Sequence, residues 1–255
     1  MARTIPLPDD ETPRVLRGAS ALGRLLGEGR GALELPRLLL RLPELSRLPG
    51  GAGRPVRVLP GFATGDGSTA LLRGFLRALD YRVRGWGLGW NHGDVPSLVP
   101  RVTAAVVRAA EEAGQPVSLV GWSLGGVLAR EAARDAPDAV ARVITLGTPV
   151  VGGPKYTAVG ALFARRGIDL DAVEAEVERR NRVPLRVPVT AIYSRGDGVV
   201  AWQACIDRVS PDVEHVEVST THLGLGFSAD VYRVVAERLA RGVSGRRSPG
   251  RVSPR

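Results

Sequence analysis

A chain of 255 residues with 44% hydrophobic residues is long enough for one large domain with its own core. The net charge of +9 comes from scattered arginines, with Lys155 the only lysine, which argues against a nucleic-acid partner. The single cysteine, Cys205, cannot form an internal disulfide. We expect it to be a small buried residue of a protein from a reducing compartment.

The N-terminal sequence has early acidic residues and prolines where a signal peptide would need an apolar run. No stretch reaches the roughly 18 uninterrupted apolar residues that a membrane-spanning helix requires. The sequence therefore predicts a cytoplasmic protein, either free or attached to the periphery of a membrane.

Residues 1–53 are predicted to form a helical arm and a linker. Leucine and arginine dominate residues 12–48, with a spacing that favours short amphipathic helices broken at Pro36 and Pro43. Such an arm can pack on the domain, cover the mouth of a site, or make a peripheral membrane contact. Residues 50–55 are rich in glycine and indicate a linker.

Residues 54–241 alternate short apolar strands with helices, a pattern typical of an α/β domain. Apolar strands joined by helices predict a mostly parallel central sheet with helices on both faces. The expected strands are 56–59, 81–86, 117–120, 140–146, 187–193 and 213–218, and the expected helices are 69–79, 95–113, 124–135 and 223–241.

Residues 149–186 interrupt this alternation. They begin with a run of glycine and proline and continue with a charged helix at about 169–182. We predict a small lid-like insertion, and an ordinary crossover helix with a long loop is the alternative. Residues 242–255 contain mainly arginine, serine, glycine and proline, which predicts a disordered tail.

The segment Gly121-Trp-Ser-Leu-Gly125 fits the pattern G-x-S-x-G between a predicted strand and a predicted helix. Glycines on either side of Ser123 remove the Cβ atoms that would clash in a sharp turn. The free N–H groups at the start of the helix favour negative charge there. We therefore predict that Ser123 is a nucleophile, and a serine that caps a glycine-rich turn is the alternative.

A serine nucleophile needs a base, and the chain has three histidines. His222 follows the last predicted strand, at the carboxyl edge of the sheet where such folds place their chemistry. His215 lies inside a strand, and His92 follows a tryptophan in a glycine-rich loop that could line a pocket entrance. We predict that His222 is the general base.

The base needs an acid that orients it. Asp197 lies in a turn directly after the predicted strand 187–193, at the same sheet edge as Ser123 and His222. In chain order it lies between these two residues. A turn-forming aspartate is the alternative reading. Asp207 and Asp212 are less favoured because no strand places them at that edge.

An oxyanion formed during attack on a carbonyl needs two backbone N–H donors. We expect Leu124, directly after the nucleophile, to supply one of them. The loop after strand 56–59 should supply the other, with Phe62 preferred because Gly61 permits a tight turn and with Ala63 as the second choice.

These motifs resemble the α/β-hydrolase superfamily, on its lipase and esterase side, over about residues 54–241. The resemblance implies an eight-stranded, mostly parallel sheet and a Ser–Asp–His triad that works without a cofactor. Many lipases carry His-Gly in the oxyanion loop, where this chain has Pro60-Gly61. The segments that carry the resemblance are Leu59-Pro-Gly-Phe62, Gly121-Trp-Ser-Leu-Gly-Gly126, Leu146-Gly-Thr-Pro149, Arg195-Gly-Asp-Gly-Val-Val200 and Thr221-His-Leu-Gly224.

The expected function is hydrolysis of a carboxylic ester, from a small molecule or a lipid, through an acyl-enzyme on Ser123. An acyltransferase with the same triad is an alternative, and a non-catalytic binding protein on a hydrolase fold is a less favoured one. We expect no cofactor and no metal ion, and leave the oligomeric state open. The residues expected to line the substrate pocket are Trp122, Thr148, Pro149 and Phe163.

Overall fold

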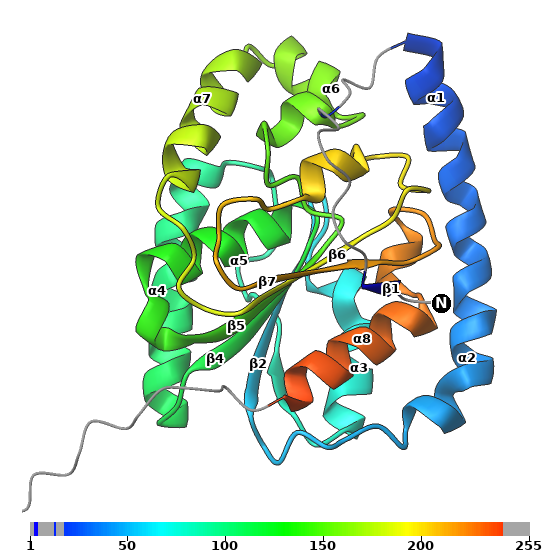
Figure 1. Ribbon diagram of the computed structural model, residues 1–255, viewed down its shortest axis with the longest axis vertical. Coiled ribbons are helices and arrows are strands. Elements are labelled where there is room, and N and C mark those ends of the chain that lie inside the picture. Colours follow the sequence, from blue (N-terminus) through cyan, green and yellow to red (C-terminus); the bar gives the residue numbers. More distant parts are fainter. Residues whose placement is uncertain (1–2, 5–12, 14–17, 242–255) are drawn as a thin grey trace, which may run out of the picture.

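A seven-stranded sheet lies at the centre of the computed structural model, which describes residues 3–4, 13 and 18–241 (Figure 1). The strand order is β1-β7-β6-β5-β4-β2-β3. Strands β2 to β7 run parallel, and β1 pairs antiparallel with β7. The described residues thus supply seven of the eight strands that the family resemblance implied. The strands are β1 (Arg3–Thr4), β2 (Pro55–Leu59), β3 (Arg82–Arg84), β4 (Val117–Trp122), β5 (Val140–Leu146), β6 (Val189–Tyr193) and β7 (Val213–Glu217).

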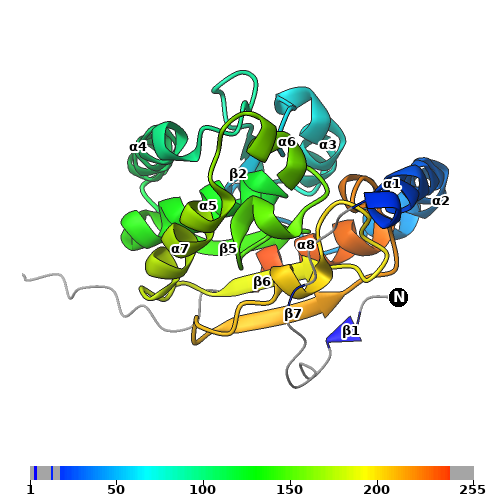
Figure 2. The same cartoon turned by 90° about the horizontal axis from the view of Figure 1, so that it is seen from above.

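Helices cover both faces of the sheet, as the alternation of strands and helices predicted (Figure 2). Side chains of β4 alternate between the two layers: Val120 and Trp122 share a core with α3 and α8, whereas Val117 and Leu119 share one with α4 and α5. The helices are α3 (Ala70–Ala78), α4 (Val95–Ala113), α5 (Leu124–Asp135) and α8 (Ala229–Ala240), and short 3-10 helices are η2 (Asp66–Thr69), η3 (Pro137–Ala139), η5 (Trp202–Cys205) and η6 (Gly224–Gly226).

The register of the parallel strands brings their carboxyl ends together. Leu59 at the end of β2 lies opposite Gly121 in β4, and Trp122 lies opposite Leu146 at the end of β5. Leu146 in turn lies opposite Ile192 in β6. The loops that follow these strands therefore leave the sheet at one edge, which is where parallel sheets place their functional residues.

The N-terminal arm forms α1 (Gly18–Gly27), η1 (Glu28–Leu33) and α2 (Glu34–Leu45), which run along one side of the molecule beside α8 (Figure 1). Leu38 and Leu45 of α2 join the same core as α8. The predicted helix breaks at Pro36 and Pro43 are wrong, since both lie inside α2. Pro36 lies in the first turn, where a backbone N–H has no helical partner to lose.

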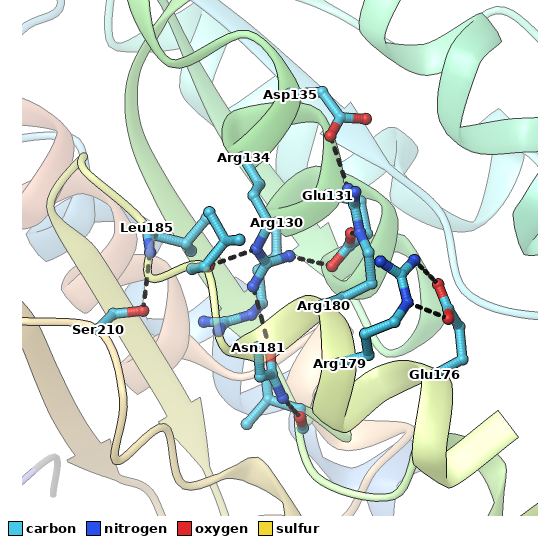
Figure 3. Close-up of polar contacts among 12 residues, drawn as sticks. Arg130, Glu131, Arg134, Asp135, Glu176, Arg179, Arg180, Asn181, Leu185 and Ser210 are labelled. Atoms are coloured by element: carbon cyan, nitrogen blue, oxygen red, sulfur yellow. Dashed lines mark hydrogen bonds and ion pairs between the residues drawn. The ribbon is translucent and has the colours of Figure 1, made fainter.

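The segment between β5 and β6 contains η4 (Gly153–Tyr156), α6 (Gly160–Arg165) and α7 (Leu170–Asn181). Asp169 caps α7 by accepting from the N–H groups of residues 171 and 172, at 2.9 and 3.1 Å. Ionic contacts tie α7 to α5 (Figure 3): Arg180 bridges Glu131 and Asp135. This charged helix is thus docked on the domain, and η4 is tied to it by the ion pairs of Lys155 with Asp171 and Glu174.

The predicted disordered tail, residues 242–255, lies outside the described residues. Among the helices that are described, none combines the length and the apolar character needed to cross a bilayer.

Candidate active site

Ser123 occupies a strained turn between β4 and α5. Its backbone has φ 53° and ψ −122°, in a region that residues with a side chain rarely adopt. The turn is possible because Gly121 and Gly125 flank it: a Cβ atom on Gly121 would lie 2.4 Å from the backbone of Gly126, and one on Gly125 would lie 2.3 Å from the Leu59 carbonyl oxygen. In the described residues, Ser123 makes no side-chain cap of α5.

Asp197 and His222 form a buried pair at the same edge of the sheet. The Nδ1 atom of His222 lies 2.6 Å from Oδ2 of Asp197, and both side chains are almost inaccessible to solvent. The other carboxylate oxygen of Asp197 accepts from the N–H groups of Val199 and Val200, at 2.8 and 2.7 Å. These contacts fix the carboxylate, which can hold the imidazole in one tautomer and orientation.

Gly147 joins this pair to the nucleophile turn. The N–H of Ser123 donates to the carbonyl of Leu146, at 2.8 Å, and Gly147 follows directly. A Cβ atom on Gly147 would lie 3.0 Å from both Asp197 Oδ2 and His222 Nδ1. The structure therefore places the three predicted residues at one edge of the sheet, after β4, β6 and β7, with Gly147 after β5 between the nucleophile turn and the Asp197–His222 pair.

The loop after β2 lies against the nucleophile. A Cβ atom on Gly61 would be 3.4 Å from the Cβ of Ser123. The Ala63 N–H already donates to the Asn91 carbonyl, at 2.8 Å, whereas the Asn91 side chain donates to the Pro60 carbonyl, at 3.1 Å. The Ala63 N–H is therefore engaged, and the N–H groups of Phe62 and Leu124 stay the predicted oxyanion donors.

Three of the expected pocket residues are buried structural neighbours of the site. Thr148 donates its hydroxyl to the Ser123 carbonyl, at 3.0 Å, so its side chain braces the nucleophile turn. Trp122 packs its ring 6.3 Å from those of both His222 and Phe227, measured between centroids. Pro149 follows Thr148 and is buried as well.

Phe163 of α6 contacts the oxyanion loop directly. Its ring centroid lies 5.0 Å from that of Phe62. The guanidinium group of Arg166 lies over the Phe62 ring, 6.0 Å from the ring centroid. The segment between β5 and β6 therefore contacts the loop after β2, which lies against the nucleophile turn.

The alternative acids and bases lie elsewhere. His215 is buried in β7, where its Nε2 accepts from the Asp207 N–H at 3.1 Å, and burial lowers its pKa. Asp207 pairs with the buried Arg130, at 2.7 Å; burial opposes its charge, but Arg130 and backbone N–H groups bring its pKa to about 2. His92 and Asp212 are exposed.

Cys205 is a buried free cysteine. Burial and the nearby Asp197 raise the pKa of its thiol, which keeps it protonated and unreactive. In the described residues no group of three or more His, Cys, Asp or Glu side chains could hold a metal ion.

Sequence reasoning missed Glu28, which reaches the site from η1 in the N-terminal arm. Its carboxylate accepts from the N–H of Gly198, at 2.7 Å, and from those of His222 and Leu223, at 3.0 and 2.7 Å. Glu28 lies between two glycines in a leucine-rich arm, and no motif there indicated a role at a site almost two hundred residues away.

The pKa of His222 predicts how activity depends on pH. Burial lowers this pKa, but the charge and hydrogen bond of Asp197, with the charge of Glu28, outweigh burial and raise it above 6.5. As the predicted general base, His222 must be neutral to accept a proton, so kcat/KM for a neutral ester is expected to rise with pH to a plateau, with its midpoint above 6.5. A pH profile of p-nitrophenyl ester hydrolysis measures this, and a rate that is flat through that range would contradict it.

No family model matches the sequence. Solved structures do: the mature form of a Bacillus licheniformis lipase aligns with a TM-score of 0.57 and 16% identity, over 76% of this chain and 94% of that one. A structure described under two metagenome-derived lipolytic enzymes, LipS and LipT, aligns with a TM-score of 0.56 and 20% identity, over 75% of this chain and 93% of that one. The thioesterase domain from the curacin biosynthetic pathway aligns with a TM-score of 0.52 and 16% identity, over 76% of this chain and 93% of that one.

The chain therefore has the α/β-hydrolase fold, the fold of these lipolytic enzymes and thioesterases. At the level of sequence it is similar to the pimeloyl-[acyl-carrier protein] methyl ester esterase of Methylococcus capsulatus, with 42% identity over 82 residues. That match covers 31% of this chain and 32% of the esterase, so it spans about a third of the relative's length.

Proposed function

We propose that the protein is a serine hydrolase of carboxylic esters that uses Ser123 as nucleophile, His222 as general base and Asp197 as the orienting acid. The observation that carries this proposal is the 2.6 Å contact between His222 and Asp197, placed beside a serine in a strained turn. A strained turn and a buried acid–base pair each have a cost in stability, and ester hydrolysis uses both.

The geometry supports a two-step mechanism. His222 takes the proton of the Ser123 hydroxyl as its oxygen attacks the ester carbonyl, while Asp197 stabilises the imidazolium. The N–H groups of Leu124 and Phe62 receive the oxyanion. His222 then gives the proton to the leaving alcohol, an acyl-enzyme remains, and a water activated by His222 releases the acid.

The class of substrate is our inference from the names of the similar proteins. The sequence relative is a methyl ester esterase, and the structural relatives include lipolytic enzymes and a thioesterase domain. We infer an oxygen ester with an extended acyl group as the substrate. The apolar contact of Phe62 with Phe163 at the edge of the segment between β5 and β6 is suited to hold that acyl group.

The test of this proposal is covalent labelling. A fluorophosphonate probe should add one adduct, located on Ser123 by peptide mass spectrometry, and p-nitrophenyl esters should be cleaved with a preference among acyl lengths. Absence of an adduct would overturn the proposal. Acyl transfer to an added alcohol that exceeds hydrolysis would favour the acyltransferase alternative.

We also propose that the N-terminal arm binds an anionic membrane surface. Leu26, Leu33, Leu39 and Leu40 are 76%, 56%, 57% and 82% exposed. The same arm carries four exposed arginines: Arg24, Arg30, Arg37 and Arg47. The described acids of the arm are engaged by other groups: Glu34 pairs with Arg37, Glu44 pairs with Arg41 and Arg233, and Glu28 accepts from backbone N–H groups. Leucines among arginines suit insertion between anionic headgroups.

Vesicle sedimentation tests this surface. Binding should require anionic lipid. The double variant Leu39→Ser/Leu40→Ser should bind at least about tenfold more weakly, because serine lacks the apolar surface whose transfer from water into the membrane is favourable. Val183→Ser is the matched control, since Val183 is 54% exposed and follows α7, which lies far from α1 and α2 in both views (Figures 1 and 2). Equal binding of the double variant and the control would refute the proposal.

A further inference from the structure

Glu28 is the residue of the N-terminal arm that makes the most direct contact with the candidate active site. It begins η1 and is 4% exposed. Its two carboxylate oxygens accept from three backbone N–H groups. One belongs to Gly198, in the loop after β6, and the other two belong to His222 and Leu223, in the loop after β7. One side chain therefore bridges the two loops that carry Asp197 and His222.

The arm approaches these loops closely enough to require glycine. A Cβ atom on Gly198 would lie 2.8 Å from Glu28 Oε1 and 2.4 Å from the Arg24 carbonyl oxygen. A Cβ atom on Gly31, one turn further along η1, would lie 2.6 Å from the Thr221 hydroxyl and 2.8 Å from the N–H of Gly224. The arm and both loops thus meet backbone to backbone.

We propose that Glu28 is a positioning residue, which holds the backbone of His222 in register with Asp197 and supplies a second negative charge to the imidazolium that forms during catalysis. The proposal rests on the proposed serine hydrolase function. A buried carboxylate is costly unless it is well bonded, and the three N–H donors meet that need. The charged groups that act on the His222 ring are Asp197, which contacts it, and Glu28, which acts on it through space.

The test separates charge from position. Glu28→Gln removes the charge and one acceptor, so the pKa of His222 should fall and kcat should drop about tenfold to a hundredfold with little change in KM. Glu28→Asp restores the charge but is one methylene too short for the same contacts. It should recover much of the His222 pKa and little of kcat.

The His222 pKa is measured by NMR titration of the imidazole, assigned against a His222→Asn variant among only three histidines. This readout needs no turnover, so it stands even where Ser123 proves unreactive and the proposed function fails. Glu34→Gln is the matched control, because Glu34 is a buried acid of the same arm whose Cγ lies beside Gly224 and whose carboxylate accepts from Arg37.

Circular dichroism melting establishes that each variant is folded at the temperature of the assay. Where Glu28→Gln does not fold, Glu28→Asp carries the test through its kcat. A His222 pKa and a kcat in the folded Glu28 variants equal to those of Glu34→Gln would overturn the positioning role.

Discussion

Ser123→Ala is expected to lose on the order of 10⁴-fold to 10⁶-fold in ester turnover while the fold persists. Members of a catalytic triad act as a unit, and without the nucleophile only oxyanion stabilisation and substrate binding remain. Alanine differs from serine by one hydroxyl and meets the same positive φ at this position, so the backbone strain of the turn is unchanged. The loss should therefore appear in kcat, with a melting temperature close to that of the parent.

The measurement is steady-state hydrolysis of a p-nitrophenyl ester, with the variant purified apart from any parent enzyme. Ser118→Ala is the control, because Ser118 lies near the start of the same strand β4, away from the carboxyl edge. It should retain activity within about twofold, because Ser118 is half-buried and loses only a hydroxyl at the end of β4 opposite the nucleophile turn. Residual activity of Ser123→Ala above a few per cent would exclude Ser123 as the nucleophile.

Gly125→Ala is expected to damage both stability and activity. The new Cβ atom would lie 2.3 Å from the Leu59 carbonyl oxygen and 2.6 Å from that of Pro60, and backbone atoms cannot rotate away. Relief requires α5 to move from the end of β2, which separates the nucleophile turn from the oxyanion loop. Overpacking of this kind costs about 1–3 kcal/mol, and a displacement of about 1 Å at the reacting groups costs about a hundredfold in rate.

Chemical denaturation and kcat/KM measured together check this prediction. Gly74→Ala is the matched control, since Gly74 lies within α3 with no atom within 4 Å of an added Cβ. That substitution should stabilise the helix by up to about 1 kcal/mol and leave activity unchanged. Unaltered activity in Gly125→Ala would show that the turn tolerates displacement and that the close approach to Leu59 has no catalytic role.

Much of the fold could be predicted because each element carried its own local signal. Asp94 is the N-cap of α4, and Gly114, in the left-handed conformation, is its C-cap. The predicted limits of α4 and α5 agree with the structure. Strand limits were less accurate: residues 81–86 were expected as a strand, and only Arg82–Arg84 pair with β2. The hydrogen bonds of a strand depend on a partner strand that lies far away in the sequence. The local pattern of residues therefore does not define where the strand ends.

The candidate site divides in the same way. Ser123, Asp197 and His222 each follow a recognisable strand, so the sequence alone predicts that they lie at one edge of a parallel sheet. Glu28 follows no strand, and its contacts form only when the arm docks on the catalytic loops. Thr148 had a predicted place near the pocket, but its hydrogen bond to the Ser123 carbonyl depends on a tertiary approach that spacing does not encode.

The carboxylate contacts of Glu28 also bear on when the protein becomes competent during its synthesis. Glu28 leaves the ribosome 170 and 194 residues before its partners Gly198 and His222. Contacts this distant must wait for those residues and require closure of a very long loop. Until then the Glu28 carboxylate has no native partner, and Leu38 and Leu45 lack the core that they join with α8. Nascent chains that stop short of His222 should therefore lack the Asp197–His222 pair, and their undocked arm should favour aggregation.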